Sequence, residues 1–250
     1  AQIGALNTSQ AAAIETGDIG ALSTNAVRAL SSAAVGALST DQIENLSSNQ
    51  IGALTSAQTA ALNTAQATTI QTSDISAIGT AAVRALTTAA IAALGTDQIA
   101  AMSTAQTSAL SSSQAQALTS NQVAALESTD LAAMNSAQIG ALNTSQAAAI
   151  ETTDISALNT TNVRALSTAA VNALTTDQIA ALTTAQTSVL TTAQAASLNT
   201  AQVAALESTD LANLNSAQVA AFNTAQAAAI ETGDISALNT TNIRALSSAA

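Results

Sequence analysis

The sequence lacks histidine, cysteine, tryptophan, tyrosine, lysine and proline, and Phe222 is its single aromatic residue. Without His or Cys there is no ordinary zinc, haem or iron–sulfur site, no thiol nucleophile and no imidazole base. Disulfide bonds are excluded as well, so the cysteine count says nothing about the redox compartment. These absences remove most catalytic chemistry, and we expect the protein not to be an enzyme.

Positive charge is also scarce, because four arginines oppose fifteen carboxylates and give a net charge of −11. Nucleic acid requires clustered Lys and Arg, and single strands also require aromatic stacking surfaces. We therefore expect no nucleic-acid partner; an acidic mimic of DNA is disfavoured by the low charge density. No apolar run approaches the roughly 18–20 residues that span a bilayer, so no membrane span is expected in this stretch.

What the sequence does contain is one unit of eight residues, repeated without insertion or deletion from Leu6 to Leu246. We call this unit an octad and number its places from the leucine: Leu, Ser/Thr/Asn, Ser/Thr, any, Gln/Asp, Ile/Val, any, Ala. A fixed short period predicts a solenoid rather than one or two globular domains. The chain opens at the fourth place of an octad and stops at the fifth. We therefore expect residues 1–250 to be a single continuous octad solenoid and a window of a longer repeat tract.

Each octad carries the start signals of a short helix. In Leu174–Ala181 (LTTDQIAA), Thr175 is a candidate N-cap and Gln178, three residues on, completes a capping box. Leu174 before the cap and Ile179 four residues after it form a hydrophobic staple. Two independent signals thus agree on one register and predict a helix of roughly five or six residues per octad. A helix this short requires stacking to be stable.

Two other folds fit the octads less well than this all-α solenoid of capped helices. In one continuous helix, eight residues advance about 80° past two turns, so the Leu stripe would spiral away from any single core. A β-solenoid is the stronger alternative, because Thr, Ile and Val suit strands. The abundant Ala and Gln and the lack of strict alternation count against it.

The differences between octads follow a second period. Nine octads are acidic: three have Asp at the fourth place, and six have Glu or Gln at the second place together with Asp at the fifth. They recur every three or four octads, at a mean spacing of about 3.4. Each octad then behaves like one residue of a superhelix with about 3.4 octads per coil. All nine fall on one side of it, with Leu, Ile and Ala filling the core. Duplication of an 80-residue block is the alternative explanation for this second period. It would account only for acidic octads that recur ten octads apart, not for the spacings of three or four octads.

The acidic octads are candidate calcium sites, since Ca²⁺ prefers several carboxylate oxygens. Two groups of four carboxylates are each expected to meet across neighbouring coils: Glu127, Asp130, Glu151 and Asp154 form the first group, and Glu207, Asp210, Glu231 and Asp234 form the second. No octad has the dense Asp/Gly spacing of a dedicated calcium loop, so a solvated acidic face is favoured over a metal site. No cofactor is otherwise expected. Each Arg octad directly follows an acidic one, which predicts weak ion pairs such as Arg28 with Asp18 or Glu15.

The octads resemble the LTTxQIxA-type octapeptide repeats of very long bacterial surface proteins, often described as adhesin-like. The resemblance covers the whole chain and implies a secreted or cell-surface location. Together with the differentiated faces, it predicts a structural repeat protein that forms an extracellular rod, stalk or filament. The expected partners are further copies of itself or other surface and matrix components. The alternative is a binding module that uses its repetitive face for calcium, glycan or ice.

Overall fold

The computed structural model describes residues 3–249, and all regular structure in that range is helical. The chain divides into two compact units, Ala1–Ala133 and Met134–Ala250. The helices of unit 1 are η1 (Ile3–Ala5), α1 (Thr8–Ala12), α2 (Thr16–Gly20), α3 (Thr24–Ala29), α4 (Ser32–Gly36), α5 (Thr40–Glu44), α6 (Ser48–Gly52), α7 (Ser56–Thr59), α8 (Thr64–Thr69), α9 (Thr72–Ile75), α10 (Thr80–Ala85), α11 (Thr88–Ala93), α12 (Thr96–Ala100), α13 (Thr104–Ala109), α14 (Ser112–Ala117), α15 (Ser120–Ala124) and α16 (Ser128–Ala133). Those of unit 2 are α17 (Ser136–Gly140), α18 (Thr144–Ala148), α19 (Thr152–Ile155), α20 (Thr160–Ala165), α21 (Thr168–Ala173), α22 (Thr176–Ala180), α23 (Thr184–Ser188), α24 (Thr192–Ser197), α25 (Thr200–Ala204), α26 (Ser208–Asn213), α27 (Ser216–Ala220), α28 (Thr224–Ala228), α29 (Thr232–Ile235) and α30 (Thr240–Ala249).

The predicted octad is confirmed: every α-helix begins at the third place, and only α30 runs on through the following octad. At α22 the Thr175 side chain accepts from the N–H of Gln178 at 3.1 Å, and the N–H of Thr175 donates to Oε1 of Gln178 at 2.7 Å. Leu174 and Ile179 are both buried, as the staple requires. The β-solenoid is wrong for the described residues 3–249, which contain no strand.

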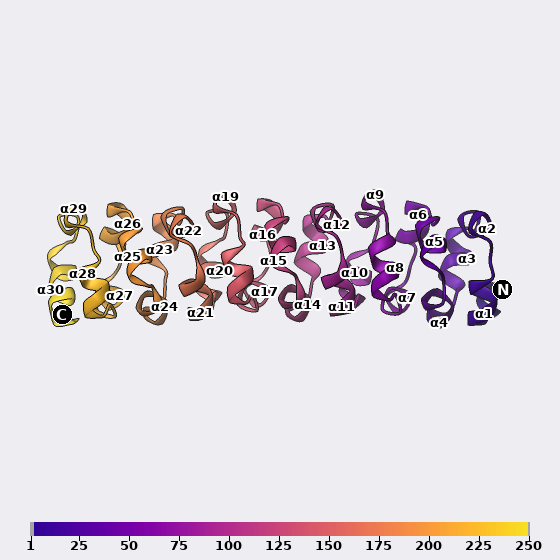
Figure 1. The fold of residues 1–250 in the computed structure, drawn as a ribbon, viewed down its shortest axis with the longest axis horizontal. Coiled ribbons are helices and arrows are strands. Elements are labelled where there is room, and N and C mark those ends of the chain that lie inside the picture. The colour runs from indigo at the N-terminus through magenta and orange to yellow at the C-terminus, as the bar shows by residue number, and fades with distance from the viewer. Residues whose placement is uncertain (1–2, 250) are drawn as a thin grey trace. The chain divides into compact units, whose positions relative to one another are not determined.

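Within each unit, every helix contacts the helix three octads further along the chain, which produces three columns. In unit 1 one column is α1, α4, α7, α10, α13 and α16; in unit 2 one column is α17, α20, α23, α26 and α29. A column does not stay on one edge of its unit: α1, α4 and α7 lie along the lower edge in Figure 1, whereas α16 lies at the upper edge. Side-chain hydrogen bonds between coils join residues 23 to 31 apart. That interval corresponds to about three to four octads, so the expected coil length of about 3.4 octads lies within it.

The core of each unit is narrow and is built from the first, fifth and sixth places of the octad. First-place residues such as Leu54 and sixth-place residues such as Ile51 are buried, and so are the fifth-place glutamines of the inner coils. The eighth-place alanines, expected in the core, are instead half-buried or exposed. They lie at the end of each helix, where the chain turns toward the next octad. There the backbone oxygen of the eighth-place residue comes close to the seventh place of the preceding coil, as that of Ala77 does to Gly52.

Replacement of two glycines of unit 1 by alanine is expected to change the free energy of unfolding in opposite directions. A Cβ on Gly52, the last residue of α6, would lie 2.7 Å from the backbone oxygen of Ala77, whereas a Cβ on Gly17 in α2 would meet nothing within 4 Å. We expect Gly52→Ala to lower the free energy of unfolding by about 1–3 kcal/mol through overpacking. Gly17→Ala is expected to raise it by about 0.5–1 kcal/mol through helix propensity. Urea denaturation followed by circular dichroism measures both; effects of the same sign would contradict this account.

Candidate functional site

The dominant polar feature of both units is a ladder of sixteen glutamines at the fifth place, all buried. Each lies at the third position of its helix, where its Oε1 accepts a hydrogen bond from the N–H of the N-cap. In α7, Oε1 of Gln58 accepts from the N–H of Thr55 at 2.8 Å. This half of the interaction is the capping box that the sequence predicts.

The other half joins successive coils. Nε2 of Gln58 donates to the backbone oxygens of Val27 and Leu30 at 2.7 and 2.8 Å. These acceptors lie 31 and 28 residues earlier, at the turn that joins α3 to α4. The same pair of acceptors recurs at fourteen glutamines: 42, 50, 58, 66, 98, 106, 114, 122, 178, 186, 194, 202, 218 and 226.

The capping box does not predict this second role, although the sequence holds its signal. A capping box accepts Glu as readily as Gln at this position. No octad has Glu at the fifth place. Of these two residues, only Gln combines the acceptor that the cap needs with a donor for the backbone carbonyls. The glutamine ladder is therefore what fixes each coil to the one before it.

The acidic octads interrupt this ladder wherever their fifth place holds Asp. Asp74, Asp130, Asp154 and Asp210 are buried. The second-place residues of α2, α9, α19, α26 and α29 make no side-chain cap hydrogen bond. The expected solvated acidic face is thus only half right: the second-place Glu side chains are exposed, but these four aspartates are buried.

An aspartate at this place accepts a hydrogen bond where glutamine donates one. The Ser48 hydroxyl donates to Oδ1 of Asp74, and the Ser208 hydroxyl donates to Oδ1 of Asp234, in each case across 26 residues. Asp210 is bonded in the same way by the side chains of Thr184 and Thr187. Burial raises the pKa of Asp210 above its ordinary value; the two threonine hydrogen bonds oppose this rise, and the charge of Glu207 adds to it.

The calcium candidates are placed as follows. Glu207, Glu231 and Asp234 line a surface hollow of about 430 Å³ where α26 packs against α29, while Asp210 is buried outside its lining. Glu151 lines a similar hollow of about 440 Å³ with Thr152 and Thr175, and Asp154 is buried. Glu127 and Asp130 lie in the other unit, the former exposed and the latter buried. Across residues 3–249 no three or more acidic side chains are arranged to hold a metal ion.

The chain matches a known repeat family. The family described as ALTTAQ repeat matches six stretches that together cover most of the chain: residues 11–48, 67–104, 123–149, 147–184, 203–229 and 227–250. The chain belongs to the ALTTAQ repeat family. No curated protein matches it.

The ALTTAQ matches keep the register of the acidic octads. Every matched stretch begins four residues before the second place of such an octad, at Glu15, Gln71, Glu127, Glu151, Glu207 and Glu231. Successive matches therefore start either seven or three octads apart. Within this chain an acidic octad therefore occupies the same position in every matched stretch.

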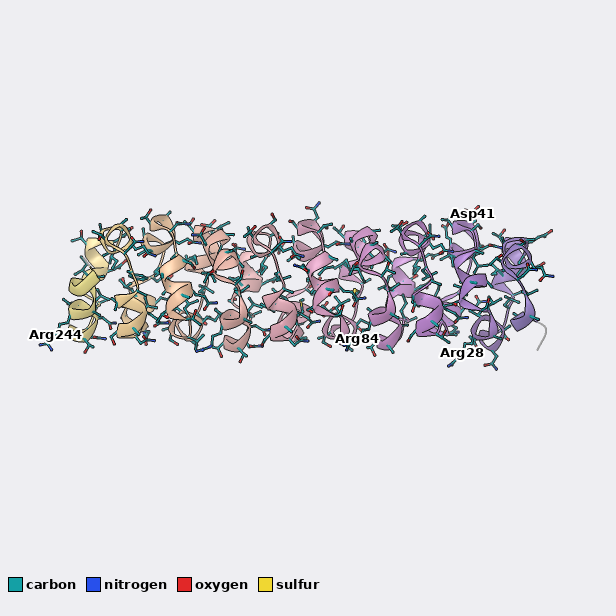
Figure 2. The ribbon with its side chains drawn as sticks, turned by 90° about the horizontal axis from the view of Figure 1, so that it is seen from below. Arg28, Asp41, Arg84 and Arg244 are labelled. Atoms are coloured by element: carbon teal, nitrogen blue, oxygen red, sulfur yellow. The ribbon has the colours of Figure 1, made fainter. Side chains whose placement is uncertain are left out.

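Two arginines of this ALTTAQ chain lie away from the acidic side of unit 1. Arg28 of α3 and Arg84 of α10 lie on one edge, and Asp41 of α5 lies on the opposite edge (Figure 2). The expected pairing of Arg28 with Asp18 or Glu15 is not found in the part of the chain that the structure describes. None of the helices within residues 3–249 has the length and apolar character needed to cross a bilayer.

Proposed function

We propose that this chain is a structural repeat protein that serves as an extracellular rod, stalk or filament. The glutamine ladder carries this proposal. It repeats the same two inter-coil hydrogen bonds through each unit, so the polar core of the fold is devoted to fixing one coil on the next. A solenoid of this kind is stabilised by nearest-neighbour contacts and can be extended by adding repeats.

The proposal is tested by the shape and association of the purified chain. We expect small-angle scattering to give an elongated particle, and electron microscopy at rising concentration to separate the two forms of the proposal. End-to-end fibres would identify a filament, whereas single elongated particles at all concentrations would identify a stalk. A compact particle would contradict both. Localisation is tested separately by surface labelling of the producing cell with an antibody against the chain.

A calcium-binding face is the second candidate, supported by the hollow that Glu207, Glu231 and Asp234 line. A ligand that binds only the folded chain stabilises it by mass action. Specific binding at saturating Ca²⁺ is therefore expected to raise the melting temperature by an amount equivalent to more than about 1 kcal/mol in the free energy of unfolding. The measurement compares melts in Ca²⁺ and in chelator. Glu231→Gln should abolish any shift, and Asp177→Asn, at an exposed acid away from this hollow, should preserve it. An unchanged melt removes the calcium hypothesis.

A further inference from the structure

The fifth place of an octad in an inner coil lies next to a fixed acceptor in the preceding coil. This acceptor is the backbone oxygen of the first-place residue that lies 28 residues earlier, as Leu30 does for Gln58. Two asparagines at the fifth place also reach it: Nδ2 of Asn162 donates to Met134 at 2.7 Å, and Nδ2 of Asn242 donates to Leu214 at 2.8 Å.

Asparagine and aspartate have side chains of the same length and shape, so an aspartate at this place reaches the same carbonyl. The ionised carboxylate has no hydrogen to give. It therefore turns to hydroxyl donors of the preceding coil, as Asp74 does with Ser48. The first-place carbonyl loses the donor that Gln or Asn supplies elsewhere, and a buried negative charge stands beside it. The lost hydrogen bond and the buried charge each weaken the contact between the two coils at neutral pH.

Protonation of the aspartate removes the buried charge and restores a hydrogen-bond donor. One proton from solvent adds to a carboxylate oxygen, and the neutral acid then has one O–H to donate. We propose that the buried Asp210 is an acid-operated latch, which on protonation donates to the first-place carbonyl of the preceding coil. The carbonyl that Asp210 would reach is that of Leu182, which lies 28 residues earlier at the first place of its octad.

The surroundings of Asp210 are suited to such a latch. Its helix, α26, packs against α23 and α29. From α23 it meets the hydroxyls of Thr184 and Thr187 and no charged group. The charged neighbours are Glu207 at the start of its own helix and Glu231 and Asp234 of α29. All three are acidic, so no cation from these helices holds the carboxylate ionised.

The sign of the pH dependence follows from the raised pKa of Asp210 in the folded chain. A carboxyl whose pKa is higher in the folded than in the unfolded state contributes stability below its unfolded value, about 3.9. This contribution is lost as the pH rises through the folded value. The latch is therefore closed in acid and open at neutral pH.

The test compares thermal unfolding of the full chain with three variants at pH 3.5 and pH 7. Asp210→Asn imitates the closed latch, and it folds by precedent because Asn occupies this place in α20 and α30. We expect its Tm at pH 7 to exceed that of the parent by about 2–4 °C, and the difference to vanish at pH 3.5. Asp177→Asn removes an exposed acid of α22 and is expected to show no such change.

Asp210→Ala separates the latch from simple removal of a buried charge. Alanine also occurs naturally at the fifth place, as in Ala82, Ala90 and Ala170, but it cannot donate. We expect Asp210→Ala to gain less than half of the Tm increase of Asp210→Asn at pH 7. Equal gains in these two variants would overturn the proposal, and so would a gain in Asp210→Asn that is the same at both pH values.

Discussion

Replacing Gln58 by glutamate is expected to lower the free energy of unfolding of the chain by about 3–5 kcal/mol, because it leaves a buried charge uncompensated. The substitution keeps the oxygen that accepts from the N–H of Thr55 and so preserves the capping box. It removes the Nε2 donor and places a negative charge against the backbone oxygens of Val27 and Leu30. Those carbonyls lose their hydrogen bonds inside a closed core, where each unsatisfied group costs about 1–3 kcal/mol.

The chain provides a matched control for Gln58→Glu in the same unit. Gln10 forms a capping box with Asn7, with distances of 3.0 and 2.9 Å, but its side chain is exposed. Gln10→Glu should therefore change stability by less than about 0.5 kcal/mol. Urea denaturation at pH 7 measures both variants. Equal losses at the two positions would mean that the glutamines act through capping alone.

A second measurement on the Gln58→Glu variant uses pH. At acidic pH the introduced glutamate takes up a proton and regains one donor, so the difference between this variant and the parent should narrow. A deficit that stays constant from pH 7 to pH 4 would indicate a packing defect rather than a lost donor. The same reasoning underlies the aspartate latch, with the sequence of this chain supplying the acid naturally at Asp210.

The local part of the fold was predictable because its signals are local. Thr175, Gln178 and Ile179 lie within five residues of one another, and the capping box and staple that they form depend only on that spacing. The coil period was also predictable, since the order of the acidic octads carries it. The sixth-place residues needed only their apolar character to be assigned to the core.

The contacts between coils were harder to predict because each relevant residue already satisfied a local rule. Gln58 fits a capping box, so nothing in the octad itself requires a second partner in the preceding coil. Asp210 fits the preference of acids for helix starts, which concealed its burial. The fifth place of an inner coil points inward whichever residue occupies it. The residues that occur at the fifth place are Gln, Asp, Asn and Ala, but never Glu. This selection is the sequence signal of the buried surroundings of that place.

The second large effect is expected at the sixth place, where a coil packs its β-branched side chain into the core. Ile179 of α22 is fully buried, and α22 contacts both α19 and α25. Ile179→Ala removes three side-chain carbons and leaves a cavity between helices that are too short to collapse independently. We expect a loss of about 2–5 kcal/mol in the free energy of unfolding.

Ile235 of α29 is the matched control for Ile179, since it occupies the same place but is 44% exposed. Ile235→Ala should cost well under about 1 kcal/mol, because little apolar area is lost from contact. Because each coil contacts only its neighbours, a weakened α22 also uncouples the repeats on its two sides. Urea denaturation of Ile179→Ala should therefore become less steep, or separate into two transitions, as cooperativity falls. A uniform shift of one steep transition, equal for both variants, would show that the sixth-place isoleucines do not couple neighbouring coils.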